Sequence, residues 1–310
     1  MTANGKDSVA DDIRALTEPR FLASFWTLSG SAHPSQCAGV SNLPFEVRAE
    51  AAAEAGFSGF GFTDEDLQAV RMHDRWRKYA DIRQFLDASG LGYLELEVVL
   101  NWFAEGEPRA ASDKVRAHLL EAAAEMGAAH IKVLADFAHQ VPLSAMVDSF
   151  GLLCEQAAAA GTRIVLEPTP LTNLSRPEEG LALIRASGAT NAGLMIDAWH
   201  MGRAGIVFDD LANIPAEYIG GVELDDADAD LHGSLLEDTM DYRRQPGEGA
   251  LEPARLIAAV HRAGYRRPFG IEVASHEHRA LPVREAARLS IAAGRVQCAL
   301  AARMVSVPAD

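Results

Sequence analysis

The chain has 310 residues, 48% of them hydrophobic, which is enough to bury a large core within one domain. Its formal net charge of -16 argues against extended DNA or RNA binding, because nucleic-acid affinity depends mainly on Lys and Arg contacts to phosphates. The three cysteines lack the spacing of a zinc site or a disulfide framework, no apolar run of about 18 residues could span a membrane, and the first residues do not form a signal sequence. We therefore expect a soluble, cytoplasmic protein that binds neither nucleic acid nor membrane.

After an N-terminal extension over residues 1–20, short apolar segments alternate about eight times with Ala-rich segments of helical period. The predicted strands are Leu22–Trp26, Gly59–Phe62, Tyr93–Val98, Ile131–Ala135, Ile164–Glu167, Leu194–Asp197, Ile219–Leu224 and Phe269–Val273. The predicted helices include Phe45–Ala55, Ala110–Met126, Leu143–Ala160 and Pro253–Ala263, with a closing helix over residues 281–304. Several helices are followed by Gly, which readily adopts the left-handed conformation at a helix end.

This alternation predicts an α/β fold, a (β/α)8 TIM barrel that forms a single domain over residues 1–310. A doubly wound open sheet is the alternative. No G-x-G-x-x-G follows the first predicted strand, so the dinucleotide-binding signature of that alternative is absent.

An acidic residue closes each of four predicted strands: Glu167, Asp197, Glu223 and Glu272. The carboxyl ends of the strands of a barrel meet at one face, where active sites lie, so we expect these carboxylates to converge. Burying them together is costly unless they meet a cation or a proton partner. Converging hard oxygen ligands indicate a site for one divalent ion such as Mg or Mn.

The longest polar segment, Asp225–Arg244, follows the seventh predicted strand and is rich in Asp and Glu. It should form a long loop at the same face as the four acids. Two interpretations are open, a lid or substrate-contacting loop and a solvated acidic loop.

Five motifs occur in a fixed order in the second half of the chain. They are Glu167, Asp197-Ala198-Trp199-His200, Val222-Glu223-Leu224-Asp225-Asp226, Arg243-Arg244-Gln245-Pro246-Gly247-Glu248-Gly249 and Gly270-Ile271-Glu272. Together they resemble the xylose-isomerase-like TIM-barrel superfamily, which includes sugar phosphate isomerases and epimerases and proteins of the AP endonuclease family 2 type. Upstream of these motifs, the resemblance is limited to the alternation of strands and helices.

In the ketose 3-epimerase branch that the chain resembles, four strand-end residues hold a divalent ion. Carried over by position, these metal ligands are Glu167, Asp197, Glu223 and Glu272. The resemblance also implies that Glu167 and Glu272 transfer protons at the substrate carbon, and that His200 and Arg243 bind substrate oxygens. It suggests a small sugar-like substrate and a homo-oligomer.

The chain departs from this family at Glu223, where His is the common residue. Like charges this close raise the pKa of at least one of the four carboxyl groups. One interpretation is that one carboxyl group stays protonated or pairs with Arg243 or Arg244. The other is that three ligands and water hold the ion. Without the imidazole, Mn or Mg is favoured, and Co or Zn are alternatives. Altered ligands also leave the substrate range open.

Trp26 and Trp102 lie near strand ends and are candidates to stack on a substrate ring, although aromatic residues usually belong to the core. Trp199 has a similar position. His33, Lys132 and Glu97 are weaker candidates for substrate contacts. The absence of a P-loop favours a substrate without phosphate.

We expect a divalent-metal-dependent isomerase or epimerase of a small sugar or cyclitol, working by carboxylate-mediated proton transfer through an enediolate. The alternative is a metal-dependent dehydratase or lyase acting on a keto-sugar, keto-glycoside or keto-cyclitol, because the same first steps precede loss of a β-hydroxyl. An abasic-site endonuclease is disfavoured by the acidic charge. A sugar-binding barrel without catalysis is disfavoured by the intact pair of Glu167 and Glu272.

Overall fold

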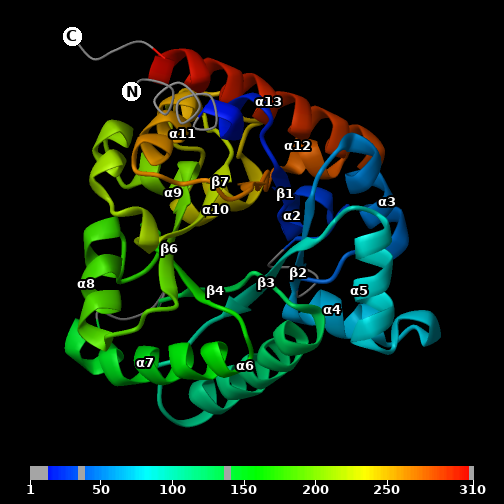
Figure 1. Cartoon of the computed structure of the whole chain (residues 1–310), viewed down its shortest axis with the longest axis vertical. Helices are drawn as coiled ribbons and strands as arrows, with labels where there is room; N and C mark the ends of the chain where they lie inside the picture. Colours follow the sequence, from blue (N-terminus) through cyan, green and yellow to red (C-terminus); the bar gives the residue numbers. More distant parts are fainter. Residues whose placement is uncertain (1–12, 34–38, 136–140, 307–310) are drawn as a thin grey trace, which may run out of the picture.

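The computed structural model describes residues 13–33, 39–135 and 141–306. Its eight strands form one closed parallel barrel, in which β1 pairs with both β2 and β8 (Figure 1). The strands are β1 Phe21–Ala23, β2 Gly59–Thr63, β3 Tyr93–Val99, β4 His130–Leu134, β5 Ile164–Glu167, β6 Ala192–Asp197, β7 Ile219–Leu224 and β8 Phe269–Ile271. The predicted (β/α)8 barrel is confirmed, and the open doubly wound sheet is excluded.

Helices surround this barrel (Figure 1). They are α2 Phe25–Leu28, α3 Phe45–Ala55, α4 Asp64–Arg71, α5 Tyr79–Ala88, α6 Gly106–Met126, α7 Leu143–Ala159, α8 Pro177–Ser187, α9 Ala198–Arg203, α10 Leu235–Asp241, α11 Pro253–Arg262, α12 His276–Arg279 and α13 Val283–Ser306. Short 3-10 segments are η1 Asp74–Trp76, η2 Phe208–Asn213 and η3 Ala216–Tyr218. Helix α13 packs against both α11 and α3, so the last helix closes the ring onto the first long one.

The core lies between the barrel and its helices, because every strand of a closed parallel sheet has one face toward the helices and one toward the interior. Strand β2, for example, is buried at all its positions. Its Phe60 and Phe62 pack against Phe45 of α3, and Phe45 also meets the Trp76 ring edge-on with centroids 5.1 Å apart. This aromatic cluster fixes α3 on the outside of the barrel.

The first and last strands end earlier than the sequence suggests. Strand β1 stops at Ala23, so Trp26 lies on the short helix α2, and β8 stops at Ile271. The cause is the side chain of Thr27, whose hydroxyl donates to the carbonyl of Ile271 and accepts from the backbone N–H of Val273. A side chain thereby takes the place of the strand partner, and Glu272 follows the last residue of β8.

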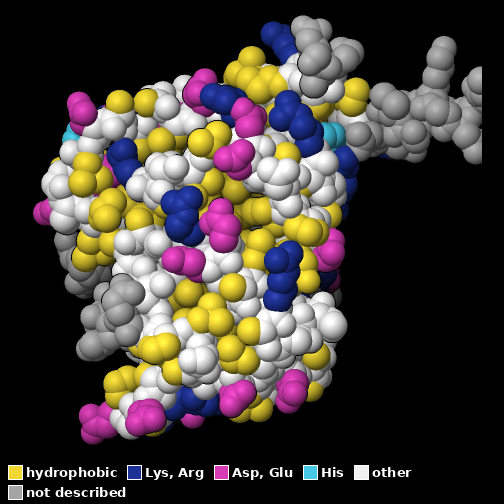
Figure 2. Space-filling model, turned by 90° about the vertical axis from the view of Figure 1, so that its left-hand side faces the viewer, with side chains coloured by type: hydrophobic (Ala, Val, Ile, Leu, Met, Phe, Trp, Pro, Cys, Tyr) yellow, Lys and Arg dark blue, Asp and Glu magenta, His cyan; other side chains and the backbone are white. Residues whose placement is uncertain are grey.

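Surface charges of both signs are mixed on the face shown in Figure 2, where Lys and Arg side chains lie singly among Asp and Glu. Across the described ranges, no helix combines the length and the hydropathy that a membrane crossing requires. Cys154 and Cys298 are free and buried, while Cys37 lies outside the described residues. Residues 1–12 of the expected N-terminal extension also lie outside them.

Candidate active site

The barrel brings the four strand-end acids to one place at its carboxyl face. Glu167 ends β5, Asp197 ends β6, and Glu223 on β7 is paired in register with both Asp197 and Gly270 of β8. Glu272 follows β8, and its backbone N–H still donates to the carbonyl of Leu224. All four side chains are buried.

A lysine ammonium lies among these carboxylates. Lys132 points inward from β4, is 1% exposed, and contacts Glu223 at 2.7 Å, Glu97 at 3.1 Å and Glu272 at 3.2 Å. Burial alone would lower the pKa of Lys132, but these three carboxylates together with Glu95 outweigh burial and raise it well above its usual range. The site therefore contains a permanent cation of its own.

Glu223 owes its place to small neighbours. Its Oε1 accepts from the Ser24 hydroxyl at 2.8 Å and from the Lys132 ammonium, which leaves Oε2 buried without a hydrogen-bond partner among the described residues. A Cβ on Gly270 would come within 2.8 Å of the Glu223 side chain, so the glycine makes room for it. Burial and the charge of Glu272 raise the pKa of Glu223 well above its usual range.

Arg243 is the second internal cation. Its Nη1 lies 2.5 Å from Asp225, 2.8 Å from Asp197 and 3.0 Å from Glu272, and Nη2 donates to the Thr239 hydroxyl. The residue is 4% exposed and lies in the polar segment that follows β7. Its guanidinium thus connects the ends of β6, β7 and β8.

Asp197 also begins a helix. Its Oδ1 accepts from the backbone N–H of His200 at 2.7 Å as the N-cap of α9, an arrangement that stabilises helix starts. This cap fixes the direction of His200, whose Nε2 lies 3.6 Å from Glu167 and 3.4 Å from Nη2 of Arg243. Burial and the neighbouring Arg243 hold the pKa of His200 well below its usual range, so its imidazole is neutral.

Glu167 is poised to hold or release a proton. Burial, reinforced by the charges of Glu272 and Asp197 and opposed by Lys132 and Arg243, raises its pKa to about 8. Its Oε1 makes no hydrogen bond with any described residue. A carboxyl with a pKa near neutrality suits general acid–base chemistry.

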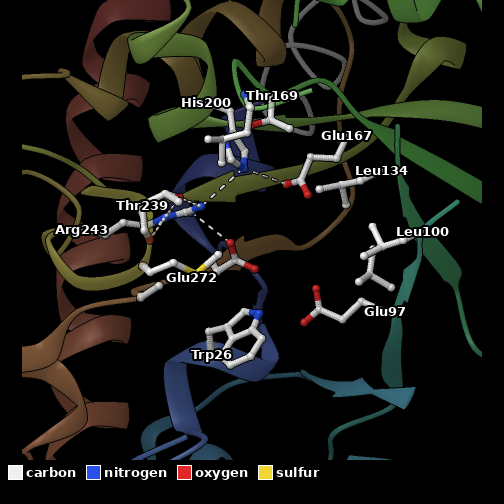
Figure 3. Close-up of a pocket in the computed structure, with 14 residues that line it drawn as sticks. Trp26, Glu97, Leu100, Leu134, Glu167, Thr169, His200, Thr239, Arg243 and Glu272 are labelled. Atoms are coloured by element: carbon white, nitrogen blue, oxygen red, sulfur yellow. Dashed lines mark hydrogen bonds and ion pairs between the residues drawn. The ribbon is translucent and has the colours of Figure 1, made fainter. Parts of the chain in front are cut away.

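These groups open into a cavity of about 210 Å³ (Figure 3). Its polar lining consists of Glu97, Glu167, Thr169, His200, Thr239, Arg243 and Glu272. The other lining residues are Trp26, Val98, Leu100, Leu134, Leu171, Met240 and Ala274. The cavity therefore combines a charged floor with largely apolar walls.

The structure separates the remaining sequence candidates. Trp26 lines the cavity, whereas Trp102 is fully buried behind its wall and donates from Nε1 to the carbonyl of Leu134. Trp199 is likewise buried, with its Nε1 bonded to Asp238. Arg244 points away to Asp228 and Glu277, so Arg243 is the arginine of this motif that faces the cavity.

Several residues of the site were missed or underrated from the sequence. Ser24 and Thr239 gave no signal, since isolated polar residues are common, and Asp225 was not singled out although it lies in the motif around Glu223. Lys132 and Glu97 did give one, since each is a charged residue near one end of a mainly apolar predicted strand. Burying a charge at such a position is costly, so a charged residue there predicts an oppositely charged partner across the barrel.

The loop after β7 is held by one carboxylate. Asp226 is fully buried, and its two oxygens accept from the backbone N–H groups of Ala227, Gly247 and Leu251. Its backbone also pairs with that of Arg244. Asp226 thereby fixes both ends of the segment that carries Arg243.

The donor set fits a divalent cation. Ligand atoms of Glu167, Asp197 and His200 lie within 4.8 Å of one another, as do those of Asp197, Glu223 and Glu272. Glu167 and Glu223 each have a buried oxygen without a hydrogen bond, and carboxylates outnumber the two internal cations. Oxygen ligands with an excess of negative charge are what Mg or Mn prefers.

Comparisons with known proteins agree with this architecture. A family model described as a xylose isomerase-like TIM barrel matches residues 49–293. The chain is 28% identical over 239 residues to a 3-dehydroshikimate dehydratase of Pseudomonas aeruginosa, a stretch that covers 76% of this chain but only 37% of that protein. The chain thus spans little more than a third of this curated relative.

Among solved structures, the IOLI protein with a bound zinc atom matches with a TM-score of 0.77 at 16% identity, over 93% of this chain and 100% of that one. An L-ribulose 3-epimerase matches with a TM-score of 0.66 at 17% identity, over 94% and 99% of the two chains. At these identities, the likeness establishes the shared fold.

Proposed function

The chain belongs to the xylose isomerase-like TIM-barrel family, and we propose that it is a divalent-metal-dependent isomerase or epimerase of a small sugar or cyclitol. The observation that carries this proposal is the pair of Glu167 and Glu272, two buried carboxyl groups on different walls of one cavity (Figure 3). Two such groups can remove a proton from a carbon atom and return one to it.

Under this proposal, the position of each residue in the cavity determines its role in proton transfer or substrate binding. The Glu167 carboxylate takes the proton from a carbon next to the substrate carbonyl, and Glu272 returns one from another direction. Arg243 and His200 lie between them and can hydrogen-bond substrate oxygens. Buried, fixed donors of this kind stabilise charge that develops on oxygen.

A divalent ion held by Glu167, Asp197, Glu272 and Oε2 of Glu223 would polarise the substrate carbonyl and make the neighbouring carbon more acidic. The all-oxygen set favours Mn or Mg, although the zinc of the IOLI protein keeps Zn among the ions to test. The two internal cations of the site, Lys132 and Arg243, are already paired with carboxylates, which favours a substrate without phosphate.

A dehydratase acting on a keto-cyclitol or keto-sugar is the second candidate. Two observations favour it, the similarity to 3-dehydroshikimate dehydratase and the apolar walls of the cavity. A linear sugar carries a hydroxyl on nearly every carbon and would leave many of them facing apolar side chains. A cyclic hydroxy-ketone presents more apolar surface.

The test combines metal analysis with substrate probes. Protein reconstituted with Mn²⁺, Mg²⁺, Co²⁺ or Zn²⁺ should bind one ion, and incubation in heavy water with L-ribulose or 3-dehydroshikimate should place deuterium on one carbon of substrate or product. Glu167→Gln and Glu272→Gln should each lower turnover by roughly 10²-fold or more, because an amide cannot accept the proton.

Glu107→Gln, on the exposed first turn of α6, is the control and should behave as the wild type. Full activity after exhaustive chelation would contradict the metal requirement. Unlabelled product together with near wild-type activity of either active-site variant would contradict proton transfer.

A further inference from the structure

Glu97 is a third cavity carboxyl that the proton-transfer pair does not need. It lies on β3, where the register against β4 shifts by one residue between Leu96 and Val99. Such a bulge re-aims side chains, and here both Glu97 and Val98 line the cavity. In Figure 3 the carboxylate points into the space bounded by Glu167, Glu272 and Trp26.

The two carboxyl oxygens of Glu97 differ in their partners. Oε2 contacts the Lys132 ammonium at 3.1 Å, while Oε1 is buried and makes no hydrogen bond with any described residue. Glu97 and Glu272 contact the same ammonium, one from β3 and the other from just after β8. A buried polar atom that faces a cavity without a partner is unfavourable until a ligand satisfies it.

The charges that face Glu97 come from three strands. They are Glu95 on β3 itself, Lys132 on β4 and Glu272 after β8. Burial, opposed by Lys132 and reinforced by Glu272 and Glu95, raises the pKa of Glu97 to about 8. At neutral pH the group is therefore mainly a carboxylic acid, whose O–H is a hydrogen-bond donor.

We propose that Glu97 is a further catalytic residue, the acid that protonates a departing substrate hydroxyl, and that this site consequently eliminates water from a β-hydroxy ketone. The inference rests on the proposed proton-transfer function and selects among its outcomes. Epimerisation or isomerisation needs only the two carboxyl groups that remove and return a carbon-bound proton. Elimination needs an acid at the neighbouring carbon, because hydroxide is a poor leaving group until it is protonated, and Glu97 lines the cavity at a position separate from the pair.

The step balances. One carboxylate of the Glu167 and Glu272 pair takes the proton from the carbon next to the carbonyl, and the electron pair of that C–H bond forms the new C=C bond. The C–O bond at the adjacent carbon breaks, its electrons stay on oxygen, and the Glu97 proton converts that oxygen to water. The products are an unsaturated ketone and water, with Glu97 ionised and the base protonated until both exchange with solvent.

Glu97→Gln separates this role from a structural one. The amide keeps the shape of the side chain and a carbonyl oxygen for Lys132, but it has no acidic proton. With Mn²⁺-loaded protein and 3-dehydroshikimate in heavy water, the variant should lose elimination by roughly 10²-fold or more. It should still place deuterium on the carbon of recovered substrate, because the base remains. Glu107→Gln should eliminate as the wild type does.

A second readout needs no substrate. Infrared spectra of Mn²⁺-loaded protein at roughly pH 6 should contain the carbonyl stretch of buried protonated carboxyl groups, with lower intensity in Glu97→Gln and unchanged intensity in Glu107→Gln. The difference between the spectra is the readout, because burial and Asp197 also raise the pKa of Asp225, whereas a carboxylate that binds a metal, such as Glu167, is deprotonated. Equal band intensity in the wild type and Glu97→Gln would overturn the inference.

The outcomes distinguish the inference from the proposed function. If Glu97→Gln eliminates at the wild-type rate, or loses deuterium exchange in proportion to elimination, Glu97 is not the acid, while proton transfer stands. If the wild type exchanges or epimerises these probes without losing water, the elimination is wrong and proton transfer again stands. If the wild type neither exchanges nor converts them, the proposed function and this inference fall together.

Discussion

Lys132 brings one positive charge to three carboxylates from three parts of the barrel. The loss of one partner of a buried ion pair is costly, because the others remain buried and uncompensated. Lys132→Met should therefore lower the free energy of unfolding by about 3–5 kcal/mol. Urea denaturation of metal-free protein would measure this effect.

The matched control is Lys114→Met on the exposed surface of α6, which should change stability by less than about 0.5 kcal/mol. Added Mn²⁺ should restore part of the stability of Lys132→Met, because the ion would compensate the same carboxylates. A variant as stable as the wild type would show that Lys132 is not the counter-ion of these acids.

At the scale of elements, the segment between β7 and α11 depends on Asp226. Asp226→Ala removes an acceptor shared by three backbone N–H groups and leaves that of Ala227 buried without a partner, at about 1–3 kcal/mol for a buried unsatisfied group. We expect faster hydrogen exchange and proteolysis within residues 228–250, and lower turnover because Arg243 loses its support.

Asp230→Ala, an exposed carboxylate in the same loop, is the control and should leave both readouts unchanged. Unaltered exchange in Asp226→Ala would mean that Arg243 and its ion pairs hold the loop without Asp226.

The strands and helices were largely predictable because their local signals are strong. Phe45–Ala55 was predicted with the bounds it has, since an apolar helical period ends at Gly56, which takes φ 98°. The end of β1 was not predictable, because it depends on Thr27 bonding to Ile271, a contact between opposite ends of the chain. Leu22–Trp26 reads as one apolar strand without that knowledge.

For the candidate site, the sequence identified the acids but not their counter-ions. Glu167 and Asp197 each close an apolar run, a pattern visible within a few residues. That Lys132 meets Glu223, and not an acid nearer in sequence, depends on how β4 and β7 face each other across the barrel. Trp102 was a false candidate for a substrate contact. An aromatic residue near a strand end can line a cavity or pack behind its wall, and local sequence does not distinguish the two positions.

For the whole molecule, the raised pKa values of Glu97 and Glu167, both about 8, make stability depend on pH. The folded state holds these protons more tightly than the unfolded state, whose carboxyl groups titrate near pH 4.5. The contribution of these two groups to the free energy of unfolding is therefore complete below about pH 4.5. It is lost as the pH rises to about 8, by about 1.4 kcal/mol per pH unit for each group.

Urea denaturation of metal-free protein across this pH range should show that the free energy of unfolding declines as pH rises. In Glu97→Gln the free energy of unfolding should decline less steeply. With Mn²⁺ at about 100 times its dissociation constant, stability should rise by about 2.7 kcal/mol, most visibly at the alkaline end, where the ligands are ionised. A pH-independent difference between the wild type and Glu97→Gln would contradict the raised pKa of Glu97.

The internal pairing of Lys132 and Arg243 with the acids also bears on the order of events during synthesis. A chain that supplies its own positive charges can complete its barrel before any ion arrives. Under the proposed function, metal loading is then a late and reversible exchange on a finished scaffold, and no step of assembly waits for it.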